Sequence, residues 1–236
     1  MNTPLQFSSE SQRMPLSMNY RKYLSEVIGT FALVFCGTGA IIINNVSGGA
    51  VTHVGISMTF GLIILSMIYA LGDISGAHFN PAVTIGFTIA KRMKMKESIP
   101  YIISQLAGAL LASLCLKLLF PQDTDLGATM PAGSDMQSFI LEMILTFFLM
   151  FVILNVSRGD KEKGITAGIA IASVVGLEAL FAGKICGASM NPARSFAPAI
   201  VSGNLHSLWI YLTAPVFGAA IAVLAHNITK TETIQS

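Results

Sequence analysis

The stretch SGAHFNPAVT, residues 75–84, is nearly repeated by CGASMNPARS at residues 186–195, about 110 positions later. Each stretch contains Gly-Ala, two further residues and then Asn-Pro-Ala. The surrounding chain of 236 residues is 53% hydrophobic and only 11% charged, whereas soluble domains carry about 25% charged residues. This composition indicates an integral membrane protein. A polar sequence motif that occurs twice in such an apolar chain needs a physical explanation.

Long apolar segments divide the chain evenly. A membrane-spanning helix needs about 20 predominantly apolar residues, and six segments meet this requirement: about 20–43, 50–71, 98–119, 136–157, 164–182 and 207–227. We therefore predict one transmembrane domain over residues 20–228, with short tails at 1–19 and 229–236. No small-residue cleavage site follows a short apolar core near the start, so we expect no cleaved signal peptide.

Basic residues predict the orientation of these segments. Lys and Arg gather before the first segment, in every second connection and after the sixth, whereas the alternate connections nearly lack them. The basic positions are Arg13, Arg21, Lys22, Lys91, Arg92, Lys94, Lys96, Arg158, Lys161, Lys163 and Lys230. Because short cytoplasmic loops carry the excess of Lys and Arg, both termini are expected in the cytoplasm, which requires an even number of spans.

The two halves of the chain repeat more than the polar phrase. The first segment contains SEVIGTF, with Glu26, and the fourth contains LEMILTF, with Glu142. The third and sixth segments carry a glycine at matching positions, Gly108 and Gly218. Because each half has three spans, an odd number, the second half must enter the membrane from the opposite side. This inverted repeat is typical of membrane transport proteins.

The repeat covers about residues 20–119 in the first half and about 136–228 in the second. Glycines recur within its spans, and we expect them to allow close packing of helices. These glycines are Gly29, Gly37, Gly61, Gly108, Gly168 and Gly218.

Each Asn-Pro-Ala phrase predicts the start of a short helix. About ten apolar residues follow Asn80 and Asn191, too few to span a bilayer but enough for a re-entrant element. Asn is a favoured N-cap, and proline suits the first helical turn, where its missing N–H leaves no bond unmade. We therefore expect two half-helices that enter from opposite faces and meet at the bilayer centre, Asn end to Asn end.

Facing half-helices would create a particular electrostatic environment. Each helix N-terminus carries roughly +0.5 of an elementary charge, so cations and protons are disfavoured where two of them meet. Each Asn amide offers two N–H donors. The loops leading in are irregular, and such backbone at membrane depth is tolerated when it is buried or lines a water-filled path. The pattern predicts a narrow passage for small neutral hydroxylated molecules.

With these features assembled, the chain resembles the aquaporin, or major intrinsic protein, family from about Tyr20 to Ala225. The paired Asn-Pro-Ala phrases, the Arg after the second phrase and the Glu in spans one and four carry the resemblance. The stretches ISGAHFNPAVTIGF, YIISQLAGALLA and GASMNPARS are most similar to the nodulin-26-like branch and its bacterial relatives. The resemblance implies an all-α membrane protein with six transmembrane helices plus two re-entrant half-helices.

The resemblance also implies a homotetramer in the lipid bilayer, each subunit having its own pore, and we expect a bacterial inner (plasma) membrane. It assigns roles to individual residues. The pore motifs are Asn80, Pro81, Ala82, Asn191, Pro192 and Ala193. The selectivity filter is Phe60, Ala179, Ala188 and Arg194. The pore-lining loop residues are Gly76, Ala77, His78, Gly187 and Ser189, and the carboxylates expected to hold the loops in shape are Glu26 and Glu142.

The filter departs from two known patterns. A Phe-Ala-Ala-Arg ring lacks the bulky His found at position 179 in water-selective members, and it lacks the second aromatic residue of glycerol facilitators. After the second phrase, Ser195 and Ala199 instead resemble water channels. We predict a passive channel for water and small uncharged solutes, such as glycerol or neutral metalloid hydroxides, that excludes protons and ions. The alternative is a strictly water-selective aquaporin.

Other classes of function have weaker support. A coupled secondary transporter also uses inverted repeats and broken helices, but only the two intramembrane Glu residues offer an ion site. An intramembrane enzyme is not expected, because Ser75, Ser189 and His78 show no nucleophile–base spacing. The three cysteines lack metal-ligand spacing, so no metal or cofactor is expected, and no basic patch suggests nucleic acid. Glu178, beside the filter, either pairs with a nearby cation or faces a neighbouring helix.

Overall fold

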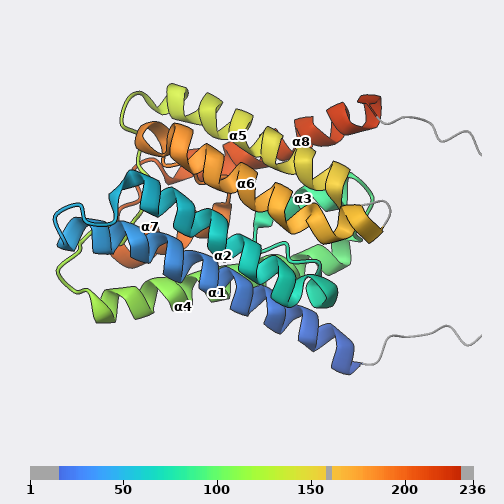
Figure 1. Cartoon of the computed structure of the whole chain (residues 1–236), viewed down its shortest axis with the longest axis horizontal. Helices are drawn as coiled ribbons and strands as arrows, with labels where there is room; N and C mark the ends of the chain where they lie inside the picture. The colour runs from blue at the N-terminus through green and yellow to red at the C-terminus, as the bar shows by residue number, and fades with distance from the viewer. Residues whose placement is uncertain (1–15, 158–160, 230–236) are drawn as a thin grey trace, which may run out of the picture.

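The computed structural model describes residues 16–157 and 161–229, which form eight α-helices (Figure 1). Six helices are long and two are short. Their bounds are α1 Leu16–Val46, α2 Thr52–Ser75, α3 Pro81–Ile89, α4 Met95–Leu119, α5 Asp135–Val156, α6 Lys161–Cys186, α7 Pro192–Ser202 and α8 Leu208–Thr229. The terminal stretches 1–15 and 230–236 lie outside the described residues, so the expected tails stay predictions.

The six long helices are long and apolar enough to cross a membrane, which confirms the all-α membrane fold. Two of them continue for four residues beyond the predicted apolar segments: α2 ends at Ser75 and α6 ends at Cys186. Asp73 and Lys184 lie in these last turns. Hydropathy falls at a charged side chain although the backbone hydrogen bonds of the helix continue, and this explains the early ends predicted from the sequence.

Matched glycines bring matched helix pairs into contact. A Cβ on Gly108 of α4 would lie 2.3 Å from the carbonyl oxygen of Val27 on α1. A Cβ on Gly218 of α8 would lie 2.2 Å from the carbonyl oxygen of Met143 on α5. Backbones approach this closely only where the interface residue is small. The two halves therefore cross their first and third helices in the same way.

The expectation that every glycine in the spans allows two helix backbones to approach closely is wrong for two of them. Gly61 does face the backbone of α6, but Gly29 and Gly37 on α1 face aromatic side chains instead. A Cβ on Gly29 would lie 2.0 Å from the ring of Phe79, and one on Gly37 would lie 2.1 Å from the ring of Phe60. These two glycines make room for rings that project from the loop and from α2.

The short helices α3 and α7 come from opposite ends of the bundle, as Figure 1 shows. Asn80 precedes α3 and Asn191 precedes α7, each in an extended backbone conformation typical of an N-cap. A proline occupies the first turn of both helices. The start of α1 and the end of α8 lie at one end of the molecule, in agreement with an even number of spans.

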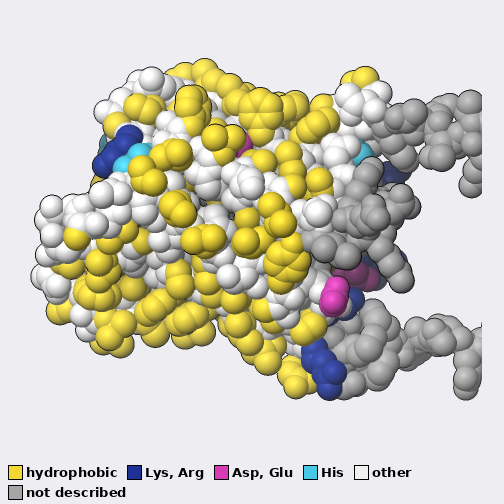
Figure 2. Space-filling model, viewed as in Figure 1, with side chains coloured by type: hydrophobic (Ala, Val, Ile, Leu, Met, Phe, Trp, Pro, Cys, Tyr) yellow, Lys and Arg dark blue, Asp and Glu magenta, His cyan; other side chains and the backbone are white. Residues whose placement is uncertain are grey.

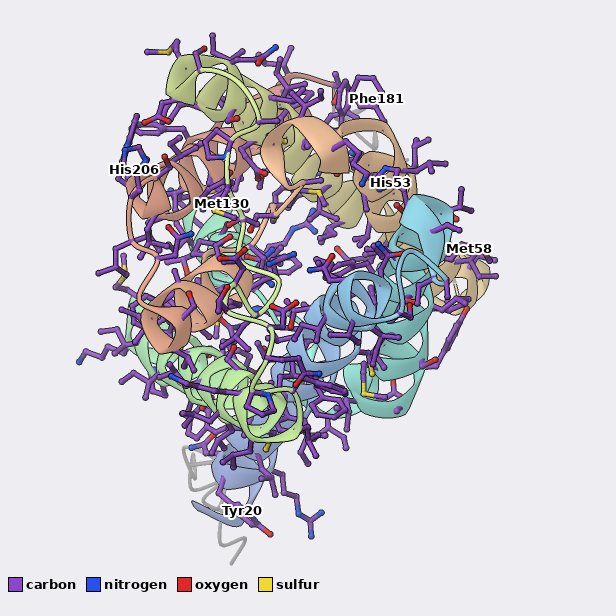
Figure 3. All side chains as sticks on the ribbon, turned by 90° about the vertical axis from the view of Figure 1, so that its left-hand side faces the viewer. Tyr20, His53, Met58, Met130, Phe181 and His206 are labelled. Carbon is purple, nitrogen blue, oxygen red and sulfur yellow. The ribbon has the colours of Figure 1, made fainter. Side chains whose placement is uncertain are left out.

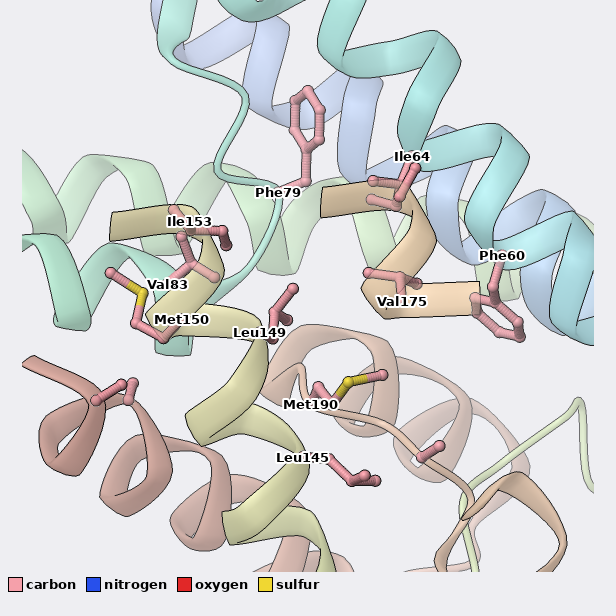
Figure 4. Packing of buried hydrophobic residues seen from close by; sticks show 14 of the residues in the cluster. Phe60, Ile64, Phe79, Val83, Leu145, Leu149, Met150, Ile153, Val175 and Met190 are labelled. Carbon is pink, nitrogen blue, oxygen red and sulfur yellow. The ribbon is translucent and has the colours of Figure 1, made fainter. Parts of the chain in front are cut away.

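The outer surface suits a lipid environment. Large apolar side chains such as Leu62, Phe148 and Leu224 are exposed there, and Figure 2 shows hydrophobic side chains spread along the length of the bundle on the visible face. Inside, the largest buried apolar cluster combines side chains of α2, α5, α6 and α8 with others from α1, α3 and the two loops. Figure 4 shows part of it, with Phe60 projecting from α2, Leu149 from α5 and Val175 from α6.

Candidate functional site

A cavity of about 100 Å³ lies between the two halves and is lined from both of them. Figure 3 looks along the bundle from one end, with His53, Met130 and His206 around the near rim. Most of the residues expected to line a pore meet in this cavity: Phe60, Gly76, Ala77, His78, Asn80, Ala179, Ala188, Ser189, Asn191 and Arg194. The topology thus brings together residues that are up to 134 positions apart in sequence.

The loops before the two Asn residues share an unusual backbone. In each loop the Gly, the Ala after it and the residue before Asn have positive φ angles. The values are 83° at Gly76, 50° at Ala77, 49° at Phe79, 87° at Gly187, 42° at Ala188 and 53° at Met190. For residues other than glycine this conformation costs of order 1–3 kcal/mol each and persists only where the surroundings impose it.

Glu26 on α1 imposes the conformation of the first loop. Its carboxylate is fully buried and accepts hydrogen bonds from the backbone N–H of His78 at 3.1 Å and of Phe79 at 2.8 Å. The side-chain amide of Gln105 on α4 donates a third bond at 2.8 Å. Charge-assisted bonds of this kind are roughly twice as strong as neutral ones.

Glu142 on α5 does the same for the second loop. It is also fully buried and accepts from the backbone N–H of Ser189 at 2.7 Å and of Met190 at 2.8 Å. Glu26 and Glu142 are therefore both engaged by loop backbone. A coupled transporter that used these two groups for its ion would have to break the loop contacts, so the geometry does not favour that alternative.

The two Asn residues join the half-helices through a reciprocal pair of bonds. The amide nitrogen of Asn80 donates to the carbonyl of Met190 at 2.7 Å, and that of Asn191 donates to the carbonyl of Phe79 at 2.8 Å. Because a side-chain amide has two N–H donors, the described bonds leave one donor on each Asn for the cavity.

The Asn side-chain oxygens have a different task. That of Asn80 accepts from the N–H of Ala82 at 2.8 Å, and that of Asn191 accepts from the N–H groups of Ala193 at 3.0 Å and Arg194 at 3.3 Å. Each Asn therefore caps its own half-helix while its amide reaches across to the other loop. The remaining motif residues, Pro81, Ala82, Pro192 and Ala193, are buried behind the cavity.

At the end of the cavity away from the start of α1 and the end of α8 (Figure 1), which we call the outer end, Arg194 is held beside Phe60. The arginine side chain is 3% exposed, and one terminal nitrogen donates to the carbonyl of Gly127 at 2.8 Å. Its guanidinium carbon lies 5.1 Å from the centre of the Phe60 ring. Ala179 and Ala188 contribute only methyl groups to this part of the wall. Gly127 carries no signal in the sequence, because it lies in a connection without any motif.

At the inner end, His78 forms the boundary of a second cavity. This vestibule of about 220 Å³ shares His78 and Phe87 with the central cavity and is lined also by Lys22, Arg92 and Tyr101 among others. The imidazole stacks on Phe87 with ring centres 4.6 Å apart. Its Nδ1 lies 3.0 Å from the hydroxyl of Thr84, which also accepts from Gln105. No role was expected for Thr84, Phe87 or Tyr101 from the sequence.

Two residues near the cavity do not have a role that the sequence suggested for them. Gly187, expected in the pore wall, does not line the cavity, and a Cβ there would lie 2.9 Å from the Thr129 side chain. Glu178 is 5% exposed, and neither of its oxygens has a hydrogen-bond partner among the described residues.

No group of three or more His, Cys, Asp or Glu within the described part of the chain is arranged to hold a metal ion.

Comparison with known proteins places this architecture among relatives. Residues 13–226 match the family model described as Major intrinsic protein. Aquaporin NIP1-1 of Oryza sativa subsp. japonica is 42% identical over 229 residues, which cover 95% of this chain and 81% of that protein. Nodulin-26 of Glycine max is 42% identical over 211 residues, covering 89% and 78%.

A solved structure is similar in fold. The X-ray structure of the aquaglyceroporin from Plasmodium falciparum matches with a TM-score of 0.77 and 27% sequence identity. The match covers 89% of this chain and 96% of that one. The three-dimensional arrangement and the sequence therefore point to the same group of proteins.

Proposed function

The chain belongs to the major intrinsic protein family, and from this premise we propose that its central cavity conducts water and small uncharged solutes such as glycerol and neutral metalloid hydroxides. The protein is a passive membrane channel and not an enzyme, as its aquaporin relatives indicate. The observation that supports this solute range is the outer ring of Phe60, Ala179, Ala188 and Arg194.

This ring has one charged side, one aromatic side and two small sides. Arg194 supplies N–H donors for a hydroxyl group, and its Nε has no hydrogen-bond partner among the described residues. Phe60 offers an apolar face against which a carbon skeleton can lie. Ala179 and Ala188 add only methyl groups to the lining and so take up little of the remaining space. A solute with hydroxyls along one edge and carbon along the other fits such a lining.

The centre of the cavity favours neutral molecules. Two helix N-termini face each other there, each with roughly +0.5 of a charge, and the Asn80 and Asn191 amides present donors. A permeating oxygen accepts these hydrogen bonds, whereas a cation meets positive potential without carboxylates facing it. We therefore expect exclusion of protons and other cations while water passes.

The strictly water-selective alternative rested on Ser195 and Ala199. In the structure Ser195 does not line the central cavity. Its hydroxyl accepts from Thr129 at 2.8 Å and also contacts the Ser189 hydroxyl. Ser195 therefore braces the second loop and adds nothing to the width of the filter, so the alternative loses much of its support.

The setting of the channel belongs to the same proposal. The protein is an integral membrane protein with six membrane-spanning helices among its described residues. We further infer cytoplasmic termini from the basic residues, and a homotetramer from the family. The bacterial inner membrane expected from the sequence has no support from the relatives named above, which come from plants and from Plasmodium falciparum.

Stopped-flow light scattering on proteoliposomes tests the proposal. Vesicles are shocked first with an impermeant sugar and then with glycerol, while a pH dye inside reports proton leak. We expect fast shrinkage with a low activation energy, then reswelling in glycerol, without proton leak. Shrinkage without reswelling would support the water-selective alternative, and saturable, ion-dependent flux would contradict a passive channel.

A further inference from the structure

We propose that Gly37, on α1 and outside the cavity, is a positioning residue that sets the width of the outer constriction by making room for the ring of Phe60. This inference rests on the proposed role of Phe60 in the filter. Gly37 is not one of the residues that line the cavity. Its effect on solutes would pass entirely through the aromatic ring.

The contact between Gly37 and Phe60 leaves no room for a side chain. A Cβ on Gly37 would lie 2.1 Å from Cε1 of Phe60, 2.5 Å from Cζ and 2.6 Å from Cδ1. One edge of the ring thus occupies the place where any other residue would carry its first carbon. Glycine is also less favourable than alanine inside a helix, so its presence here is explained by the ring.

The helix α1 cannot move away to relieve such a clash. Val34 and Thr38, on either side of Gly37 along α1, are fully buried. A Cβ on Gly127 would lie 2.9 Å from the Cβ of Thr38, so the outer connection packs tightly against the same stretch of α1. The carbonyl of Gly127 in turn binds Arg194, and displacing this connection would disturb the filter itself.

The helix α2, which carries Phe60, is held equally closely on its other side. A Cβ on Gly61 would lie 3.1 Å from the carbonyl oxygen of Ala172 and 3.4 Å from Cα of Gly176, both on α6. With both backbones fixed, the ring itself must turn. The space available to it is the cavity, whose lining includes the methyl groups of Ala179 and Ala188 and the Arg194 side chain.

A methyl group at position 37 would therefore narrow the filter by pushing the Phe60 ring into the cavity. The ring has to move by roughly 1 Å or more before its edge reaches ordinary van der Waals contact. That movement carries it toward Arg194 and across the opening. Glycerol, which is wider than water, should lose more permeability than water does, because the pore diameter is the property that changes.

The test compares Gly37→Ala with wild type and with Gly39→Ala in proteoliposomes. Gly39 is the matched control, since it lies two positions further on the same helix and a Cβ there meets only Cδ2 of Leu116 at 3.4 Å. For Gly37→Ala we expect glycerol permeability to fall at least about tenfold and water permeability by less than about threefold. Gly39→Ala should keep the wild-type ratio of the two.

A second background separates positioning from a general packing defect. In Phe60→Ala no atom beyond Cβ remains to be displaced, so adding Gly37→Ala should leave the glycerol-to-water ratio of Phe60→Ala unchanged. If Gly37→Ala alone fails to fold because of the clash, the double variant should recover its yield and monodispersity. An unchanged ratio in Gly37→Ala, an equal drop in the Phe60→Ala background, or failure of both variants to fold would overturn the inference.

The outcomes also distinguish this inference from the proposed function. If wild type conducts glycerol and Ala179→His reduces it while Gly37→Ala does not, the filter stands and only the role of Gly37 fails. If wild type conducts water but excludes glycerol, the proposed solute range fails. Gly37 is then judged on water permeability, which must fall in Gly37→Ala and recover in the double variant.

Discussion

The inner and outer halves of this channel share the contacts that support their loops and half-helices, but they differ in the side chains that face the cavity. In both halves a buried Glu fixes a strained loop, an Asn caps a half-helix, and the Asn amide binds the other loop. The residue three positions after Asn is Val83 in the inner half and Arg194 in the outer half. The residues shared by the two halves form the channel, and the residues that differ between them determine its selectivity.

The supports around the two loops differ as well. In the inner half, Gln105 donates to Glu26, and the Tyr101 hydroxyl donates to the carbonyl of Ser75 at 2.9 Å. In the outer half, proline occupies the position that corresponds to Gln105, and the hydroxyl of Tyr211 has no partner within the described part of the chain. The outer loop is braced instead by hydroxyl groups of the connection before α5 and of α7. The outer half therefore depends more heavily on its single carboxylate.

Removing that carboxylate should have the largest effect. Glu142→Ala would leave the backbone N–H groups of Ser189 and Met190 buried and unpaired, at about 1–3 kcal/mol each. We expect water flux equal to that of empty vesicles and a clear loss of thermal stability in detergent. Glu26→Ala should lose less, because the inner loop keeps the bond from the Tyr101 hydroxyl to the carbonyl of Ser75 and the Gln105 amide keeps its bond to Thr84. Normal flux in either variant would contradict the assigned support role.

Making the outer half resemble the inner half should have the next largest effect. Arg194→Val places at the outer constriction the side chain that Val83 has in the other repeat. With the cation gone, we expect a measurable proton leak and faster glycerol flux, while water flux changes by less than about threefold. Dye-loaded proteoliposomes measure all three. A variant with wild-type glycerol flux and no leak would show that Arg194 does not control passage.

The two Asn residues provide the finest comparison. Asn191 caps two backbone N–H groups and Asn80 caps one, and loss of a cap costs about 0.5–2 kcal/mol. Asn191→Ala should therefore unfold at a lower temperature than Asn80→Ala when both are heated in the same detergent. Equal midpoints would mean that the second cap bond, to the N–H of Arg194, contributes nothing.

Much of the frame could be predicted from the sequence, because its determinants are local. Apolar length specifies the six spans, and an Asn followed by Pro specifies the start of each half-helix. The inverted order of the two halves follows from the odd number of spans in each. The ends of α1, α2, α6 and α8 were placed two to four residues too early. The error is largest at α2 and α6, where charged residues lie within the last helical turn.

The contacts that hold the site together were not predictable, because they join residues without a sequence signal. The carbonyls of Phe79 and Met190 accept the Asn amides, and any residue type has a carbonyl. Arg194 binds the backbone of Gly127, 67 positions away. Gly37 had the wrong expected role because a glycine within an apolar span indicates close approach without saying whether a helix or a ring approaches.

The most direct test of the proposed filter is the glycerol permeability of Ala179→His relative to wild type in the same proteoliposome preparation. An imidazole at this position would replace the methyl group of Ala179 in the lining of the cavity and take up space that is now open. We predict that glycerol reswelling slows at least about tenfold while water permeability stays within about threefold. Unchanged glycerol flux would contradict the claim that small side chains at 179 and 188 admit the solute.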